Sequence, residues 1–164
     1  MCSRRKMNEC RFKSESGKKD RIREFLYKHS DMPRNAVDEL LEKSLDNFSL
    51  KCDDNEIISS ATYTPTDWYL CAIKGLATTP KYRGKGFGTE VVDDIMEKTK
   101  RDPHCLVLTS DIRYDNKPSK SIFEKHGFEE VNRFCWGEGE KPADILQLVR
   151  FPPHDGRYCW NEKE

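Results

Sequence analysis

Long apolar runs are missing from this chain of 164 residues. A membrane-spanning helix needs about 18 or more consecutive apolar residues, and no stretch of the sequence approaches that length. The first residues, MCSRRKM, also lack the apolar core that a signal peptide requires. We therefore expect no membrane partner and a cytoplasmic location.

A net charge is missing as well, because 29 basic side chains balance 29 acidic ones. Proteins that bind nucleic acid in a general way carry an excess of basic residues, so we expect no nucleic-acid partner. The hydrophobic fraction of 35% is enough for a sizeable core. Single cores usually serve about 100 to 200 residues, and this length predicts one domain.

Paired cysteine motifs are the third absence. The seven cysteines are widely spread and include no C-x-x-C pair. Both a disulfide framework and a zinc site are disfavoured by this odd count and spacing, so we expect neither disulfides nor a bound metal. Small buried hydrophobic side chains in a reducing compartment are a better interpretation than a catalytic thiol.

The most informative stretch is residues 80–99, which read PKYRGKGFGTEVVDDIMEKT. Glycines at positions 84, 86 and 88 free the backbone just before an apolar stripe with helical spacing, formed by Phe87, Val91 and Ile95. A glycine-rich loop that leads into a helix offers unpaired N–H groups and the positive end of the helix dipole to an anion. Further positive charge on the same rim comes from Lys81, Arg83 and Lys85.

Two nucleotide-binding motifs fail on spacing. A Walker loop needs Ser or Thr after its lysine, but Lys85 is followed by Gly86, and the Rossmann fingerprint would need a glycine where Thr89 stands. The pattern R-x-x-G-x-G is filled by Arg83, Gly86 and Gly88. It closely resembles the acyl-CoA pyrophosphate loop of the GNAT superfamily of N-acyltransferases. When this motif is considered by itself, a flexible basic turn before an ordinary helix stays an alternative interpretation of the loop.

A second stretch strengthens this resemblance. In the superfamily, a later segment opens a helix with Asn and ends it with Gly-Phe, and the matching residues here are Asn116, Ser119, Ile122, Phe123, Gly127 and Phe128. The resemblance covers residues 57–151 by pattern. It implies an α/β fold with a GNAT-like mixed, mostly antiparallel central sheet flanked by helices. It also implies one N-acetyltransferase domain over residues 1–164, with a C-terminal tail at 152–164.

The order of elements can be read from local patterns. We expect a loosely alternating first strand at residues 7–13 and a helix that is capped by Ser16 or Asp20 and runs to residue 28. A second helix begins near Pro33, and a hairpin covers residues 48–63. Strands follow at 68–79, 106–111, 128–136 and 145–151, and Gly75 marks a bulge in the first of these.

The resemblance implies acetyl-CoA as co-substrate, with thioester and arm contacts at backbone groups of the strand before the loop. The expected donor contacts are Leu76, Ala77, Thr78, Arg83, Gly84, Lys85, Gly86, Phe87, Gly88, Thr89, Asn116, Ser119 and Phe123. Many members place a proton-donating tyrosine where this chain has Phe123. Substituting tyrosine there is expected to restore a proton donor.

Catalysis needs a base for the amine and a proton for the departing thiolate. The candidates near the two motifs are Asp111, Tyr114 and Ser121, and solvent water is the alternative for both roles. For the acceptor side we expect Asp31, Glu138 and Glu140. Their negative charge favours a cationic amine, while solubilising a turn is the other interpretation of the two glutamates.

The sequence therefore predicts an N-acetyltransferase that moves an acetyl group from acetyl-CoA to a primary amine of a small molecule or protein. The amine attacks directly in a ternary complex, and a homodimer is compatible with the sequence. One alternative is an acyl-CoA-binding module without turnover, which Phe123 favours. Another is a structural or regulatory protein that associates through its charged surface.

Overall fold

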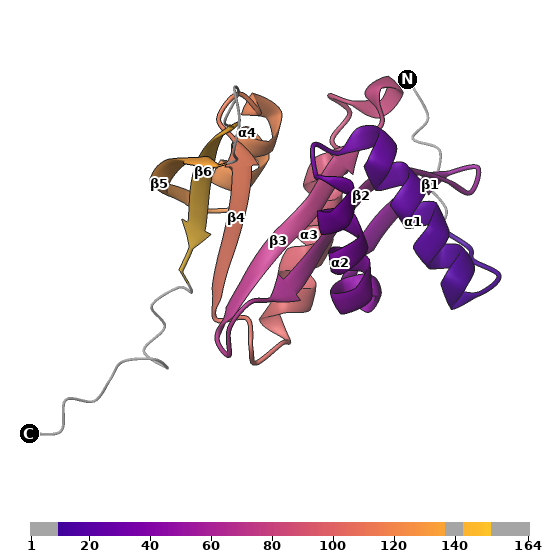
Figure 1. The fold of residues 1–164 in the computed structure, drawn as a ribbon, viewed down its shortest axis with the longest axis horizontal. Coiled ribbons are helices and arrows are strands. Elements are labelled where there is room, and N and C mark those ends of the chain that lie inside the picture. The colour runs from indigo at the N-terminus through magenta and orange to yellow at the C-terminus, as the bar shows by residue number, and fades with distance from the viewer. Residues whose placement is uncertain (1–9, 137–142, 152–164) are drawn as a thin grey trace, which may run out of the picture.

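The computed structural model describes residues 10–136 and 143–151, which form a six-stranded sheet with helices on both faces (Figure 1). The helices of these residues are α1 (Glu15–His29), α2 (Arg34–Ser44), α3 (Phe87–Lys100) and α4 (Lys117–Lys125), with short 3-10 turns η1 (Leu45–Asn47) and η2 (Pro80–Tyr82). The strands are β1 (Ser49–Asp53), β2 (Glu56–Pro65), β3 (Leu70–Thr78), β4 (Val107–Arg113), β5 (Glu129–Trp136) and β6 (Ala143–Arg150). Every helix in the described residues is too short or too polar to cross a lipid bilayer.

The sheet is mixed and mostly antiparallel, which confirms the predicted fold class. Its strand order is β1-β2-β3-β4-β6-β5, and only the β3–β4 pair is parallel among the described strands. A parallel pair needs a crossover connection, and α3 supplies it. The glycine loop lies at the start of this crossover.

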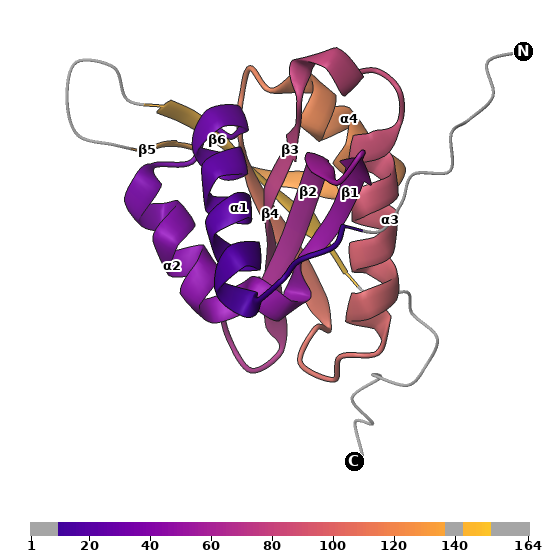
Figure 2. The same ribbon diagram turned by 90° about the vertical axis from the view of Figure 1, so that its right-hand side faces the viewer.

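Two layers of helices cover opposite faces of the sheet (Figure 2). On one face, α1 and α2 pack through buried side chains that include Ile22, Leu26 and Leu41. On the other face, α3 packs through Val91, Val92 and Ile95 onto strand residues such as Ile73 and Leu146. Helix α3 thus buries Val91 and Ile95 of the apolar stripe that its sequence periodicity predicted.

The expected start of the first helix was wrong by a few residues. The N-cap is Ser14, whose hydroxyl accepts a hydrogen bond of 3.0 Å from the Gly17 N–H, rather than Ser16 or Asp20. Ser16 lies inside α1, where its side chain is exposed. Pro33 caps the second helix, as its fixed φ predicted.

The predicted first strand at residues 7–13 was also wrong where the structure describes it. Residues 10–13 form no strand, and residues 7–9 lie outside the described part. This segment is held by side chains instead, because Arg21 donates to the Arg11 carbonyl at 3.0 Å and lies 4.7 Å from the Phe12 ring centroid. The weak alternation of apolar and polar residues in this segment therefore reflects partial burial of its side chains, and it does not indicate a strand paired in the sheet.

The expectation of no disulfides was wrong for four of the seven cysteines. The structure pairs Cys10 with Cys52 and Cys71 with Cys105, at Cα separations of 5.4 and 5.2 Å. Cys71 is the second residue of β3 and Cys105 precedes β4, so the parallel pairing of these strands brings the two together. Wide sequence spacing does not oppose a disulfide when the sheet supplies the proximity.

Candidate functional site

The glycine loop opens a backbone surface at the start of α3. Gly84 and Gly86 have φ angles of +73° and +90°, and a Cβ on either would meet no atom within 4 Å. Within the described residues, no hydrogen-bond acceptor is found for the N–H groups of Phe87, Gly88 and Thr89, whereas Glu90 already donates to the Gly86 carbonyl at 3.0 Å. Unpaired first-turn N–H groups at an accessible helix start suit a phosphate group.

The third glycine of the motif has a different physical role. Gly88 is buried, and a Cβ there would lie 2.9 Å from Ile122 Cδ1 and 3.6 Å from Thr78 Oγ1. A bare backbone at this position therefore lets α3 approach β3 and α4 closely. The motif combines two open glycines for a ligand with one that sets helix packing.

Aromatic and basic side chains surround the loop. The Lys81 and Lys85 ammonium groups lie 5.4 and 5.2 Å from the Tyr82 ring centroid, and Tyr82 itself hydrogen-bonds Asp53. The Arg83 Nε donates to the Thr78 carbonyl at 3.1 Å, which folds this exposed side chain back along the end of β3. The rim is positively charged beside the open N–H groups.

Next to this loop, β3 and β4 part from each other. Their parallel register covers only Leu70–Ala72 against Val107–Thr109, and the strands diverge beyond it (Figure 1). Ser110 Oγ still donates to the Ile73 carbonyl at 3.2 Å. Lys74 and Asp111 come next when this register is extended, so they form the first pair beyond the Ile73–Ser110 contact. We call this opening between the two strands the β3–β4 split.

A bulge follows at once on β3, which confirms the sequence expectation for Gly75. The register with β2 changes between Ser60 and Thr62, so that Gly75 and Leu76 together oppose Ala61. Gly75 adopts a φ of +67°, and its carbonyl accepts a hydrogen bond of 2.7 Å from Ser60 Oγ. The bulge turns the backbone of Leu76, Ala77 and Thr78 beside the split.

Asp111 lies on the face of the sheet that α1 and α2 cover in part. Its neighbour Ile112 packs in the α3-side core, and side chains alternate along a strand, so Asp111 points to the other face. Removal from water by nearby protein atoms raises the pKa of Asp111, although the residue keeps exposed surface, while Lys74 and a hydrogen bond from Gln147 oppose this shift. A carboxylate with a raised pKa is a better proton acceptor than an ordinary one.

The rim around Asp111 carries both signs of charge. Arg113 hydrogen-bonds Asp115 at 3.2 Å, and Asp115 first and Asp31 next raise the pKa of Arg113. Because the charge of Asp31 affects the pKa of Arg113, Asp31 in the α1–α2 joint lies on the same side of the molecule as the end of β4. The two other predicted acceptor-side residues, Glu138 and Glu140, lie outside the described residues.

Tyr114 extends the rim beyond β4. Its ring lies 3.6 Å from the Arg133 guanidinium carbon, and its N–H donates to the Asp144 carbonyl at 2.8 Å. Arg133 also hydrogen-bonds the Asp144 carboxylate at 2.8 Å. The Tyr114 side chain is about half exposed, so its hydroxyl stays a candidate proton donor at the edge of the site.

The remaining predicted residues lie on α4 or at its start, and they point to different sides of this helix. The Asn116 side chain caps the helix by accepting from the Ser119 N–H at 3.3 Å, and Ser119 is buried. Phe123 is only 1% exposed and packs 5.1 Å from the Phe128 ring, so in this structure it belongs to the core rather than to an open surface. Ser121 is exposed on the opposite side of α4, away from Ser119 and Phe123. Phe123 therefore offers no exposed group to a ligand in this structure, and Ser121 lies on the outer face of α4.

The sequence did not single out Lys74 or Gln147, because their proximity to Asp111 depends on strand register. His29, at the end of α1, packs against Phe25 with ring centroids 5.1 Å apart. Burial lowers the pKa of His29, and the charges of Lys28 and Arg83 lower it further. His29 therefore lies near the arginine of the glycine loop.

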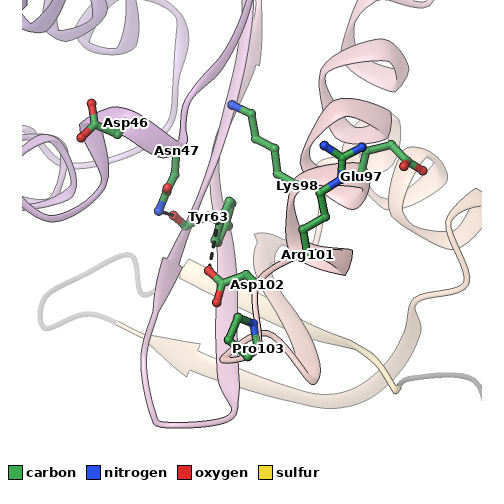
Figure 3. A pocket seen from close by; sticks show the side chains of 8 residues that line it. All are labelled: Asp46, Asn47, Tyr63, Glu97, Lys98, Arg101, Asp102 and Pro103. Atoms are coloured by element: carbon green, nitrogen blue, oxygen red, sulfur yellow. Dashed lines mark hydrogen bonds between the residues drawn. The ribbon is translucent and has the colours of Figure 1, made fainter.

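A cavity of about 530 Å³ lies beside the C-terminal end of α3 and is lined by residues that include Tyr63, Lys98 and Asp102 (Figure 3). The glycine loop lies at the opposite end of this helix. Several polar groups of the cavity are already hydrogen-bonded: Tyr63 Oη donates to Asp102 at 3.3 Å, and Asn47 Nδ2 donates to the Tyr63 carbonyl at 3.0 Å. Lys98 Nζ donates to the Phe48 carbonyl at 2.9 Å. Since its groups are paired in this way, we do not place the reaction there. The described residues contain no group of three or more acidic, histidine or cysteine side chains that could hold a metal ion.

An accessible helix start with unpaired N–H groups beside a split parallel strand pair is typical of a protein that binds a phosphate-containing molecule. Comparison with known proteins gives the family: residues 14–128 match the model of the Acetyltransferase (GNAT) family, and the chain belongs to that family. The resemblance inferred from the two motifs is therefore confirmed.

Individual relatives agree with this assignment. An N-acetyltransferase 9-like protein from Nematostella vectensis is 32% identical over 68 residues, which span 42% of this chain and only 34% of that relative. Among solved structures, Ard1 from Thermoplasma volcanium superposes with a TM-score of 0.70 at 14% identity, covering 87% of this chain and 95% of its own. A GNAT acetyltransferase from Elizabethkingia anophelis with acetyl-CoA bound gives a TM-score of 0.62 at 20% identity, covering 74% and 84%. At these identities, the structural likeness shows the fold.

Proposed function

We propose that this chain transfers an acetyl group from acetyl-CoA to a primary amine of a small molecule or protein, by direct attack in a ternary complex. The observation that supports the proposal most is the arrangement along β3. At its end lie the open N–H groups of the glycine loop, and at its middle lies the split with Asp111. A donor held at the loop and extended along β3 would present its thioester at the split.

The donor contacts follow from this arrangement. The N–H groups of Phe87, Gly88 and Thr89 would bind the pyrophosphate, with Lys85 and Arg83 adding positive charge. The backbone of the bulge and of Leu76, Ala77 and Thr78 would hydrogen-bond the pantetheine arm. The Thr78 carbonyl already accepts from Arg83, and its second lone pair leaves room for one more donor.

The chemistry needs one bond formed and one broken. The neutral amine attacks the thioester carbonyl carbon, the tetrahedral intermediate expels the CoA thiolate, and an amide forms. We assign Asp111 as the group that takes the amine proton, directly or through one water, because its raised pKa suits a base. The thiolate receives its proton from water or from the hydroxyl of Tyr114, since Phe123 offers none.

A second candidate function is an acyl-CoA-binding module without turnover. It is favoured by one observation, the apolar and buried Phe123 at the place where many relatives of this fold carry a tyrosine. Thiol release from acetyl-CoA, measured over a panel of amines and peptides, separates the two functions. Release that depends on both the amine and Asp111 supports the transferase. Donor binding without release from any amine overturns it in favour of the binding module.

A further inference from the structure

Lys74 is the cation that faces Asp111 across the β3–β4 split. It pairs in register with Thr62, whose hydroxyl donates to the Ser44 carbonyl at 3.2 Å at the end of α2. Cross-strand partners point to the same face of a sheet, so Lys74 lies on the α2 side, as Asp111 does. The two residues therefore flank one opening on one face.

The Lys74 ammonium group is not neutralised by contact. Among the described residues, it makes no ion pair within 4.0 Å. Its charge is felt by Asp111 and by Glu39, yet Glu39 already hydrogen-bonds Lys43. Lys74 is exposed and keeps its N–H donors for a ligand.

The other cations of this rim differ in this respect. Arg113 is bonded to Asp115 at 3.2 Å, and Arg133 is bonded to Asp144 at 2.8 Å. Their positive charges are therefore balanced by adjacent carboxylates. Lys74 is thus the cation beside Asp111 that can give its charge to an acceptor molecule.

We propose that Lys74 selects acceptors that carry a carboxylate close to the amine that is acetylated. An amine placed at Asp111 has its neighbouring substituents within reach of Lys74 across the split. A carboxylate there forms a charge-assisted hydrogen bond, while a cationic substituent is repelled. The proposal rests on the acetyl transfer proposed above and gives Lys74 a role in specificity.

This preference is opposite to the cationic acceptor expected from the sequence. That expectation depended on Glu138 and Glu140, which lie outside the described residues, and on Asp31, which interacts with Arg113. The described charges at the split favour an anionic substituent instead. The carboxylate can come from the side chain of an N-terminal acidic residue or from the α-carboxylate of a free amino acid.

The test uses the full chain, acetyl-CoA and matched acceptors. Three peptides with amidated C-termini differ only in their first residue, which is Glu, Gln or Lys, and free glutamine is compared with glutamine amide. Initial rates of thiol release are measured for wild type, Lys74→Met and Lys74→Glu. Lys100→Met is the control, because Lys100 is exposed at the far end of α3 and pairs with Glu97.

We expect kcat/KM for the preferred carboxylate-bearing acceptor to exceed that for its neutral match at least tenfold in wild type. Lys74→Met should remove this ratio by raising KM for the carboxylate acceptor only, and Lys74→Glu should favour the Lys peptide. Comparison of the peptide series with the glutamine pair shows whether Lys74 recognises a side-chain carboxylate or an α-carboxylate. Lys100→Met should behave as wild type.

Three results would overturn the proposal: a wild-type preference for the Lys peptide, no carboxylate preference in either arm, or an equal fall in kcat for every acceptor in Lys74→Met. Calorimetric binding of the same acceptors in the presence of CoA gives a readout without turnover. If no amine releases thiol, the transferase proposal fails. The binding ratio between wild type and Lys74→Met then still decides the role of Lys74.

Discussion

Gly86 offers a sharp test of the donor site, because it combines a left-handed backbone with open space. Its φ of +90° disfavours any residue with a Cβ, yet a Cβ would meet no atom within 4 Å. Gly86→Glu should therefore cost about 1 to 2 kcal/mol of folding stability through backbone strain alone. It should also place a carboxylate beside the unpaired N–H groups at the start of α3.

The expected effect on binding has a cause separate from this cost in folding stability. A negative side chain at the helix start competes with the pyrophosphate for the same N–H groups and repels it. We expect the Kd for acetyl-CoA to rise at least tenfold, which corresponds to about 1.4 kcal/mol of binding free energy. Isothermal titration calorimetry on the folded variant measures this change directly.

Gly127→Glu is a matched control. Gly127 follows α4 with a φ of +82°, and a Cβ there would lie 3.7 Å from Arg150 Nε, away from the glycine loop. It introduces the same strain and the same charge, so urea unfolding should show a similar stability loss with unchanged acetyl-CoA affinity. Equal affinity of Gly86→Glu and wild type, or an equal loss in both variants, would refute the assignment of the loop.

Three further predictions concern catalysis and stability. Folding raises the pKa of Asp111, so its ionised form costs stability at a pH above the folded-state pKa; this cost shrinks as the pH falls through that pKa and is absent below the unfolded-state pKa. Asp111→Asn should therefore be more stable than wild type to urea at neutral pH while losing thiol release, and full activity in this variant would exclude Asp111 as the base. Phe123→Tyr should lose about 1 to 3 kcal/mol by burying a hydroxyl in the core, with no faster release, whereas acceleration would show that the hydroxyl reaches the thiolate. Reduction of the Cys71–Cys105 disulfide, which joins residues 34 positions apart, should lower the free energy of unfolding by roughly 4 kcal/mol, and identical urea midpoints with and without reductant would contradict this.

The same disulfides bear on the cytoplasmic location, which stays a prediction. Disulfides are rare in cytosolic proteins because cellular reductants keep thiols reduced. In that compartment the four paired cysteines should react with a thiol reagent after unfolding under non-reducing conditions. Protein extracted with its disulfides intact would contradict the cytoplasmic prediction.

The parts of the fold that local sequence determines were predicted well. The glycine loop, α3 and the Gly75 bulge follow from glycine positions and an apolar period within about 25 residues of chain. Residues 10–13 were misassigned because a short alternating segment can be buried by side-chain contacts without joining a ladder. The disulfides were missed because the fold, not the spacing of cysteines, decides which sulfurs meet.

The catalytic side of the site shows why the remaining features could not be read from the sequence. Asp111 was predicted as a candidate from its place at the end of a strand, but no local pattern connects it with Lys74, 37 positions earlier. Their relation depends on the parallel register of β3 and β4 and on the point where that register ends. The proposed donor site is thus encoded by a contiguous motif, whereas the proposed acceptor site arises from strand pairing. If Lys74 selects the acceptor as proposed, two chains with the same glycine loop can differ in acceptor through one residue on β3, without any change in the motif that identifies the family.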